Sequence, residues 1–140
     1  GIETHTTDLI RSELEAGGHE QALAYFKSGQ IREHGLGFEE LAEVAALEAE
    51  VGSKARFNDC SVLLLARKLD AMLLSSDKAL RKAAEARAVE VHGTLWIMDR
   101  LVEARVLAPR VAASKLSHLL LLERYFPKAE CHARMKQWGG

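Results

Sequence analysis

Short apolar runs alternate with longer runs of helical period from residue 2 to residue 92. The apolar runs are rich in β-branched residues or leucine and predict strands at Ile2–Thr7, Ile31–Leu36, Ala71–Ser75 and Ala88–His92. The longer runs repeat their apolar positions every three or four residues and predict helices at Asp8–Glu15, His19–Ser28, Phe38–Val51, Asp59–Asp70 and Lys78–Arg87. Because strands and helices alternate, the pattern favours an α/β fold of three layers, with a parallel sheet flanked by helices.

From Thr94 onward the sequence predicts additional helices only. Apolar stripes run through Leu95–Val102 and Val111–Tyr125, and Pro127 restarts the chain into a last helix that reaches Trp138. A chain of 140 residues has the size of one compact domain. We therefore expect a single domain over residues 1–140, with an α/β core at 1–93 and a helical part at 94–140.

The helix predicted over Phe38–Val51 shows its apolar residues as a stripe. Phe38, Leu41, Ala45 and Ala49 recur at the helical spacing, and glutamates occupy other faces. The spacing predicts that this stripe faces the core.

Composition and charge exclude several classes of protein. Apolar residues make up 48% and charged residues 28% of the chain, which excludes a mainly disordered state, and a net charge of −1 provides no overall positive field. No apolar run is long enough to span a membrane, and no secretory leader is visible. Cys60 and Cys131 lack metal-ligand spacing, and the six histidines show no HxH, HxxxH or HExxH pattern. We expect structural or surface roles for the histidines, a buried Cys60, and a reducing cytoplasm.

Three acids fall near the predicted carboxyl edge of the sheet. A helix of about eleven residues starting at Asp59 descends roughly 16 Å at about 1.5 Å per residue. The next strand, of about five residues, climbs roughly 16 Å back at about 3.3 Å per residue and leads to Asp77. Glu13 lies in the first helix after the first strand. Carboxylates gathered in this way repel one another and are normally compensated by a hard cation such as Mg²⁺ or Mn²⁺.

Simpler roles remain open for each acid. Asp59 and Asp77 stand directly before predicted helices, where an Asp side chain caps backbone N–H groups. Glu13 alone reads as a solvated helix residue. Four basic residues flank the two aspartates: Lys54, Arg56, Lys78 and Arg81. They either lie on solvent-exposed helix faces without a specific role or bind RNA phosphates.

Three segments around these acids resemble the PIN domain, a small α/β nuclease module of bacterial and archaeal toxins and RNA-processing enzymes. Thr6–Leu14 resembles the family's strand and the following helix with a Glu-Leu pair, and Asn58–Ala66 resembles its Asp-headed buried helix. Ala71–Arg81 resembles the strand that ends in Thr/Ser-x-Asp. The family opens with a further strand that carries a first Asp, and this sequence begins after that position.

The resemblance implies a ribonuclease that uses Mg²⁺ or Mn²⁺ to hydrolyse RNA phosphodiesters. It implies that Glu13, Asp59 and Asp77 bind the metal or orient water bound to it, and that Ser75 supports the site by hydrogen bonding. It also implies a toxin whose leucine-rich C-terminal helices bind an antitoxin-like helix, or alternatively a second copy in a homodimer. Two other hypotheses remain open: an inactive PIN-like module that binds RNA or protein, and a receiver-like domain with Asp77 as phosphoacceptor.

Overall fold

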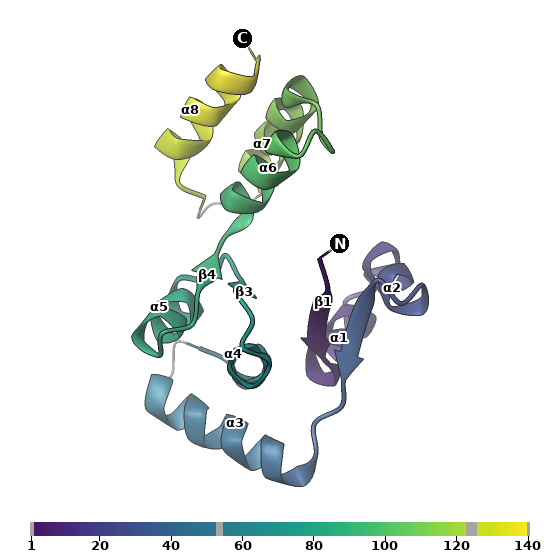
Figure 1. The fold of residues 1–140 in the computed structure, drawn as a ribbon, viewed down its shortest axis with the longest axis vertical. Helices are drawn as coiled ribbons and strands as arrows, with labels where there is room; N and C mark the ends of the chain where they lie inside the picture. The colour runs from purple at the N-terminus through teal and green to yellow at the C-terminus, as the bar shows by residue number, and fades with distance from the viewer. Residues whose placement is uncertain (1, 53–54, 123–125, 140) are drawn as a thin grey trace. The chain divides into compact units, whose positions relative to one another are not determined.

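The computed structural model describes residues 2–52, 55–122 and 126–139, and strands and helices follow in the predicted order (Figure 1). The chain divides into two compact units, Gly1–Val91 and His92–Gly140. The elements up to the boundary are β1 (Thr4–Thr7), α1 (Asp8–Ala16), α2 (Glu20–Lys27), β2 (Ile31–His34), α3 (Phe38–Val51), α4 (Phe57–Leu69), β3 (Leu73–Leu74), α5 (Lys78–Ala86) and β4 (Val91–His92). The elements after it are α6 (Thr94–Glu103), α7 (Pro109–Leu122) and α8 (Lys128–Gly139).

The described strands form two sheets of two strands each. β1 runs parallel to β2, with Thr4 opposite Ile31 and Thr7 opposite His34. β3 lies beside β4, and the backbone N–H of Leu73 donates to the carbonyl of Glu90 over 2.8 Å. The α/β class with additional C-terminal helices is therefore confirmed, with short strands in two small sheets.

β3 and β4 are shorter than the apolar runs that predicted them, because the turns that close the preceding helices extend into these runs. Asp70 and Ala88 adopt left-handed backbone conformations, with φ of 50° and 57°. The next residue then donates back across the helix end, from Ala71 to the carbonyl of Ala66 over 2.9 Å and from Val89 to that of Ala84 over 2.9 Å. These are Schellman motifs, so the first residues of both apolar runs complete helices instead of pairing in a sheet.

α4 lies at the centre of the first unit. Its residues Cys60, Ser61, Leu63, Leu64, Leu65 and Ala66 are all buried. Four of them, Cys60, Leu63, Leu64 and Ala66, pack in one cluster with side chains from α3, α5, β3 and β4, among them Val44, Leu47, Leu73, Leu80, Ala84 and Val91. The buried face of α3 is therefore the one with Val44 and Leu47, and the predicted stripe is wrong, since Phe38 is 91% exposed. Alanines on several faces of α3 blur its periodicity, and the larger branched side chains face the core.

The second unit packs α6, α7 and α8 around a separate apolar cluster. Leu95, Met98, Leu116 and Trp138 form its buried part, and Arg134 of α8 donates to both carboxylate oxygens of Asp99 on α6 at 2.8 to 3.1 Å. The last residues of the helix predicted over Val111–Tyr125, at 123–125, lie outside the described residues. Within the described ranges, no helix is long and apolar enough to cross a membrane.

Candidate functional site

Three acidic side chains come from three helices of the first unit or the residues that cap them. Glu13 lies on α1, Asp59 lies in the first turn of α4, and Asp77 immediately precedes α5. Burial raises the pKa of Asp59, and the negative charge of Asp77 and then that of Glu13 raise it further. The charges of the other two carboxylates therefore both act on Asp59.

Asp59 is not the N-cap that one interpretation of the sequence predicted. α4 starts two residues earlier, at Phe57, and its N-cap is Arg56, whose side chain makes no capping hydrogen bond. Asp59 is instead the third residue of the helix, and a hydrogen bond from the Arg56 backbone N–H together with the Arg56 charge lowers its pKa against the stronger raising effects. This reach back to the cap residue is half of a capping box.

Asp77 is an N-cap, in agreement with the simpler interpretation. Its Oδ1 accepts a hydrogen bond from the backbone N–H of Leu80 over 2.8 Å. The Ser75 hydroxyl accepts from the backbone N–H of Asp77 over 3.1 Å and so supports the turn that carries this carboxylate. Asp77 is exposed, and the cap uses only Oδ1, so it leaves the other carboxylate oxygen of Asp77 for other interactions.

Glu13 is connected to α4 through Asn58, a residue whose role the sequence analysis missed. The Asn58 side chain donates from Nδ2 to Glu13 Oε1 over 2.6 Å. One hint of a role for Asn58 was visible in the sequence, its position directly before Asp59. The hydrogen bond itself could not be predicted, because it joins residues 45 positions apart and depends on tertiary structure.

A chain of buried hydroxyl groups fixes the start of α1 against α4. The backbone N–H of Ile10 donates to Thr7 Oγ1 over 3.4 Å, Thr7 Oγ1 lies 2.8 Å from Ser61 Oγ, and Ser61 Oγ donates to the Asn58 carbonyl over 2.6 Å. A hydroxyl has one proton, and that of Ser61 is used on Asn58, so Thr7 donates to Ser61. Thr7 and Ser61 are both 0% exposed. The helix of Glu13 and the helix of Asp59 are therefore joined through directional bonds.

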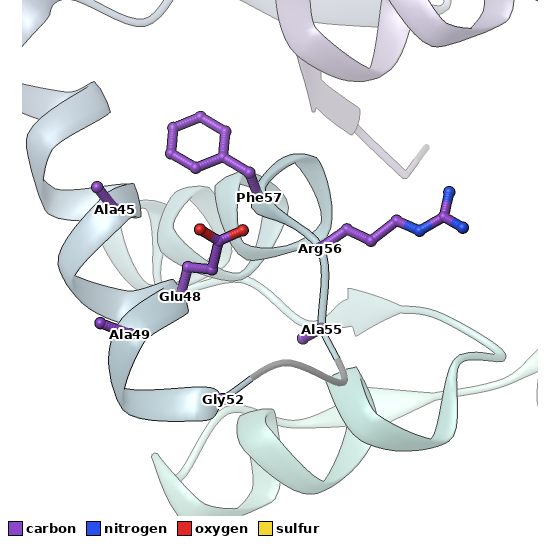
Figure 2. Close-up of a pocket in the computed structure, with 7 residues that line it drawn as sticks. All are labelled: Ala45, Glu48, Ala49, Gly52, Ala55, Arg56 and Phe57. Atoms are coloured by element: carbon purple, nitrogen blue, oxygen red, sulfur yellow. The ribbon is translucent and has the colours of Figure 1, made fainter.

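The predicted RNA-binding residues differ in how far their side chains are exposed to solvent. Arg56 and Lys78 are exposed and Arg81 is half-buried, next to Asp59 or Asp77 in the chain. Figure 2 shows the Arg56 side chain extending away from the residues of α3. Lys54 lies outside the described residues.

A hollow of about 550 Å³ lies between the end of α3 and the start of α4 (Figure 2). Its lining consists of alanines and a glycine with the ring of Phe57 and the charged side chains of Glu48 and Arg56. The acids are the better candidate site, because one of them, Asp59, has a pKa raised by burial and by the charge of Asp77. Cys60 is fully buried, as predicted, and burial followed by the charge of Glu48 raises the pKa of its thiol, which argues against a nucleophile.

Comparison with known proteins identifies the family of the chain. A family model described as a PIN domain matches residues 3–140. No curated protein and no solved structure matches the chain. PIN domains are generally nucleases, act on nucleic acids and use divalent metal ions. Because the match covers nearly every residue, including the segments of all three acids, the chain belongs to the PIN-domain family.

Proposed function

We propose that this PIN domain is a metal-dependent endoribonuclease that hydrolyses RNA phosphodiesters, with Glu13, Asp59 and Asp77 as ligands of Mg²⁺ or Mn²⁺. The observation that carries the proposal is the mutual repulsion of these acids: burial and the charges of Asp77 and Glu13 raise the pKa of Asp59. Surplus negative charge of this kind is compensated by a hard divalent cation, for which carboxylate oxygens are the preferred ligands.

The carboxylate oxygens of the three acids are the type of ligand that such a cation prefers, although the three side chains are not preformed as a complete metal site. Among the described residues, no group of three or more His, Cys, Asp or Glu side chains is arranged to hold a metal ion. Mg²⁺ usually keeps several waters and uses only one or two carboxylates, so Asp59 with one neighbouring acid meets its requirement. When bound, the ion supplies an activated water and neutralises charge on the phosphate.

The chain's own residues hold the acids in position for this role. The cap bond to Leu80 fixes one oxygen of Asp77, and Ser75 fixes its backbone, so Ser75 acts as a positioning residue. Asn58 fixes one oxygen of Glu13. In each case one carboxylate oxygen is oriented by the protein and the other is left for the ion or its waters.

Basic side chains beside the acids support binding of an RNA backbone. Arg56, Lys78 and Arg81 adjoin Asp59 or Asp77 in the chain, and Arg56 and Lys78 are exposed. We include Lys54 in this set from its sequence position. Contacts of this type predict RNA affinity that falls steeply with salt concentration.

Cleavage of a mixed RNA pool in Mg²⁺ or Mn²⁺ tests the proposal. Asp77→Asn and Asp59→Asn are the informative variants, since Asn at position 77 keeps the N-cap while it removes the charge. Asp70→Asn is the matched control, because Asp70 is exposed at the other end of α4 and Asn tolerates its left-handed conformation. We expect EDTA and both site variants to lower cleavage at least tenfold and the control to cleave normally. Cleavage that survives EDTA and Asp59→Asn would contradict the proposal.

A second function is a PIN module that binds RNA or protein without cleaving it. The spacing of the acids favours this alternative, since they do not form a ready-made metal cage within the described residues. Its signature is a folded chain that shifts RNA in a gel, does not cleave it in either metal, and keeps its RNA affinity in Asp59→Asn.

The toxin role is a finer proposal that rests on the C-terminal helices. Leu121 and Leu122 of α7 are 82% and 79% exposed, which supports a partner surface for an antitoxin-like helix or a second copy. Growth arrest on expression tests the toxin role, and the mass of Leu121→Gln/Leu122→Gln against wild type by light scattering tests the homodimer. We also propose a reducing cytoplasm, since Cys60 and Cys131 are both buried and free.

A further inference from the structure

Two histidines that are far apart in the sequence meet on the sheet formed by β1 and β2. Nδ1 of His5 lies 2.8 Å from Nε2 of His34, and the ring centroids are 5.0 Å apart. The parallel register pairs His5 with Arg32 and Thr7 with His34, so both histidines lie on the face that carries the buried Thr7. Their separation of 29 residues explains why no histidine motif was visible in the sequence.

The second nitrogen of His5 is held by a carboxylate. Its Nε2 lies 3.3 Å from Glu3 Oε2, and the other oxygen of Glu3 lies 3.3 Å from Arg32 Nη1. A carboxylate accepts only, so this network assigns the proton of a neutral His5 to Nε2. Nδ1 of His5 then directs its lone pair at His34, as in the carboxylate–histidine pairs that orient metal ligands.

We propose that His5 and His34 form a binding site for Zn²⁺, separate from the acidic site. Imidazole nitrogens favour Zn²⁺ and related transition metals, whereas carboxylates favour Mg²⁺ and Mn²⁺. When the ion binds, the proton of neutral His34 moves from Nε2 to Nδ1, so that the lone pairs of His5 Nδ1 and His34 Nε2 both face the ion. Two Zn–N bonds of about 2.0–2.1 Å at a tetrahedral angle separate the nitrogens by about 3.3 Å, so the rings need to part by only about half an ångström.

The site has two protein ligands, and water fills the other positions. This agrees with the absence of any metal-holding group of three or more such side chains within residues 2–52, 55–122 and 126–139. The His5 side chain is 19% exposed, which leaves access for those waters. An ion with open positions binds more weakly than a closed structural zinc and keeps exchangeable ligands. The inference uses no residue of the proposed nuclease site and does not depend on it.

Titration of the tag-free full chain with Zn²⁺ by calorimetry, and with Co²⁺ by visible absorption, tests the proposal. We expect one ion per chain and nitrogen-type Co²⁺ bands. His34→Gln keeps a hydrogen-bonding side chain while removing the imidazole, and it should lower Zn²⁺ affinity at least tenfold, as should His5→Ala. Glu3→Gln should weaken binding about 10- to 100-fold. His118→Ala, at an exposed position of α7, is the matched control and should bind normally.

Histidine ¹⁵N shifts give a readout that does not depend on the stability of any variant. Zn²⁺ should move Nδ1 of His5 and Nε2 of His34 in wild type and equally in Asp59→Asn. The proposal is overturned if wild type binds no more Zn²⁺ than the His5→Ala/His34→Gln double variant. It is also overturned if Asp59→Asn abolishes binding, because the acids would then be the zinc ligands.

Discussion

Replacing Ser61 with alanine would remove the centre of the hydroxyl chain that joins the start of α1 to α4. Thr7 donates to Ser61 over 2.8 Å, and both residues are 0% exposed. Without Ser61 Oγ, the Thr7 hydroxyl proton is left buried without an acceptor, which costs about 1–3 kcal/mol. The Asn58 carbonyl is affected less, because it lies in the first turn of α4 and can also accept a backbone hydrogen bond within the helix. We therefore expect Ser61→Ala to lower the free energy of unfolding by about 1–3 kcal/mol.

A double-mutant cycle isolates this contact. Thr7→Val removes the acceptor for the Ile10 N–H at the start of α1, a loss worth about 0.5–2 kcal/mol for a helix cap. The double variant leaves no orphaned hydroxyl, so its cost should fall short of the sum of the single costs by about 1 kcal/mol or more. Ser12→Ala is the control, since the exposed Ser12 hydroxyl bonds only to the Asp8 carbonyl of its own helix, and it should stay within about 0.5 kcal/mol of wild type.

Urea unfolding followed by far-ultraviolet circular dichroism measures these costs. Tryptophan fluorescence does not report on this contact, because both tryptophans, Trp96 and Trp138, lie in the second unit. The reasoning is refuted if Ser61→Ala unfolds within about 0.5 kcal/mol of wild type, or if the two single costs add to the double within that error.

Three further outcomes follow from the same structure. Burial and the charge of Asp77 raise the pKa of Asp59, so this residue stabilises the fold below its ordinary pKa of about 3.9 and loses that contribution as the pH rises through the raised value. The midpoint of thermal unfolding of Asp59→Asn should therefore lie above that of wild type at pH 7, and the difference should shrink as the pH is lowered toward 4. A difference that does not change with pH would contradict this. Ala88→Gly relieves a left-handed strain of about 1–2 kcal/mol against a glycine entropy cost of about 0.5–1 kcal/mol, so a net gain of about 0.5–1 kcal/mol is expected in urea, and a loss would count against it. Arg134→Ala removes the partner that donates to both carboxylate oxygens of Asp99, whose side chain is 27% exposed. It should lower the free energy of unfolding, followed by tryptophan fluorescence, by about 1–2 kcal/mol. An unchanged free energy of unfolding would show that the ion pair does not stabilise the fold.

The order of the elements could be predicted because each helix and strand carries its own period. The extent of β3 and β4 could not, since nothing in the sequence marks Asp70 and Ala88 as left-handed helix ends where glycine is usual. The pairing of strands into two short sheets is likewise a tertiary outcome that local patterning does not determine.

The joint placement of Glu13, Asp59 and Asp77 at one edge of a sheet stays a prediction. It was predicted from a strand of about five residues before Asp77, whereas β3 has two residues, so the position of Asp77 depends on the turns that flank this strand. Two contacts depend on how distant segments pack: the Asn58 bond to Glu13 and the pairing of His5 with His34. Sequence motifs with a fixed spacing detect ligands on one helix or hairpin, and they cannot detect pairs that come together only in the folded chain.

The helix that carries Glu13 is the least anchored part of the candidate site. α1 buries none of its own residues, whereas α4 buries six. Segments with little buried apolar surface open locally at low free energy, so α1 can detach while α4 stays folded. Its attachment then depends on Thr7 and Asn58, at the cap and at the carboxylate. Any ligand that bridges Glu13 and Asp59 would be linked thermodynamically to the closing of α1, and its measured affinity would be the intrinsic affinity reduced by the fraction of chains in which α1 is docked.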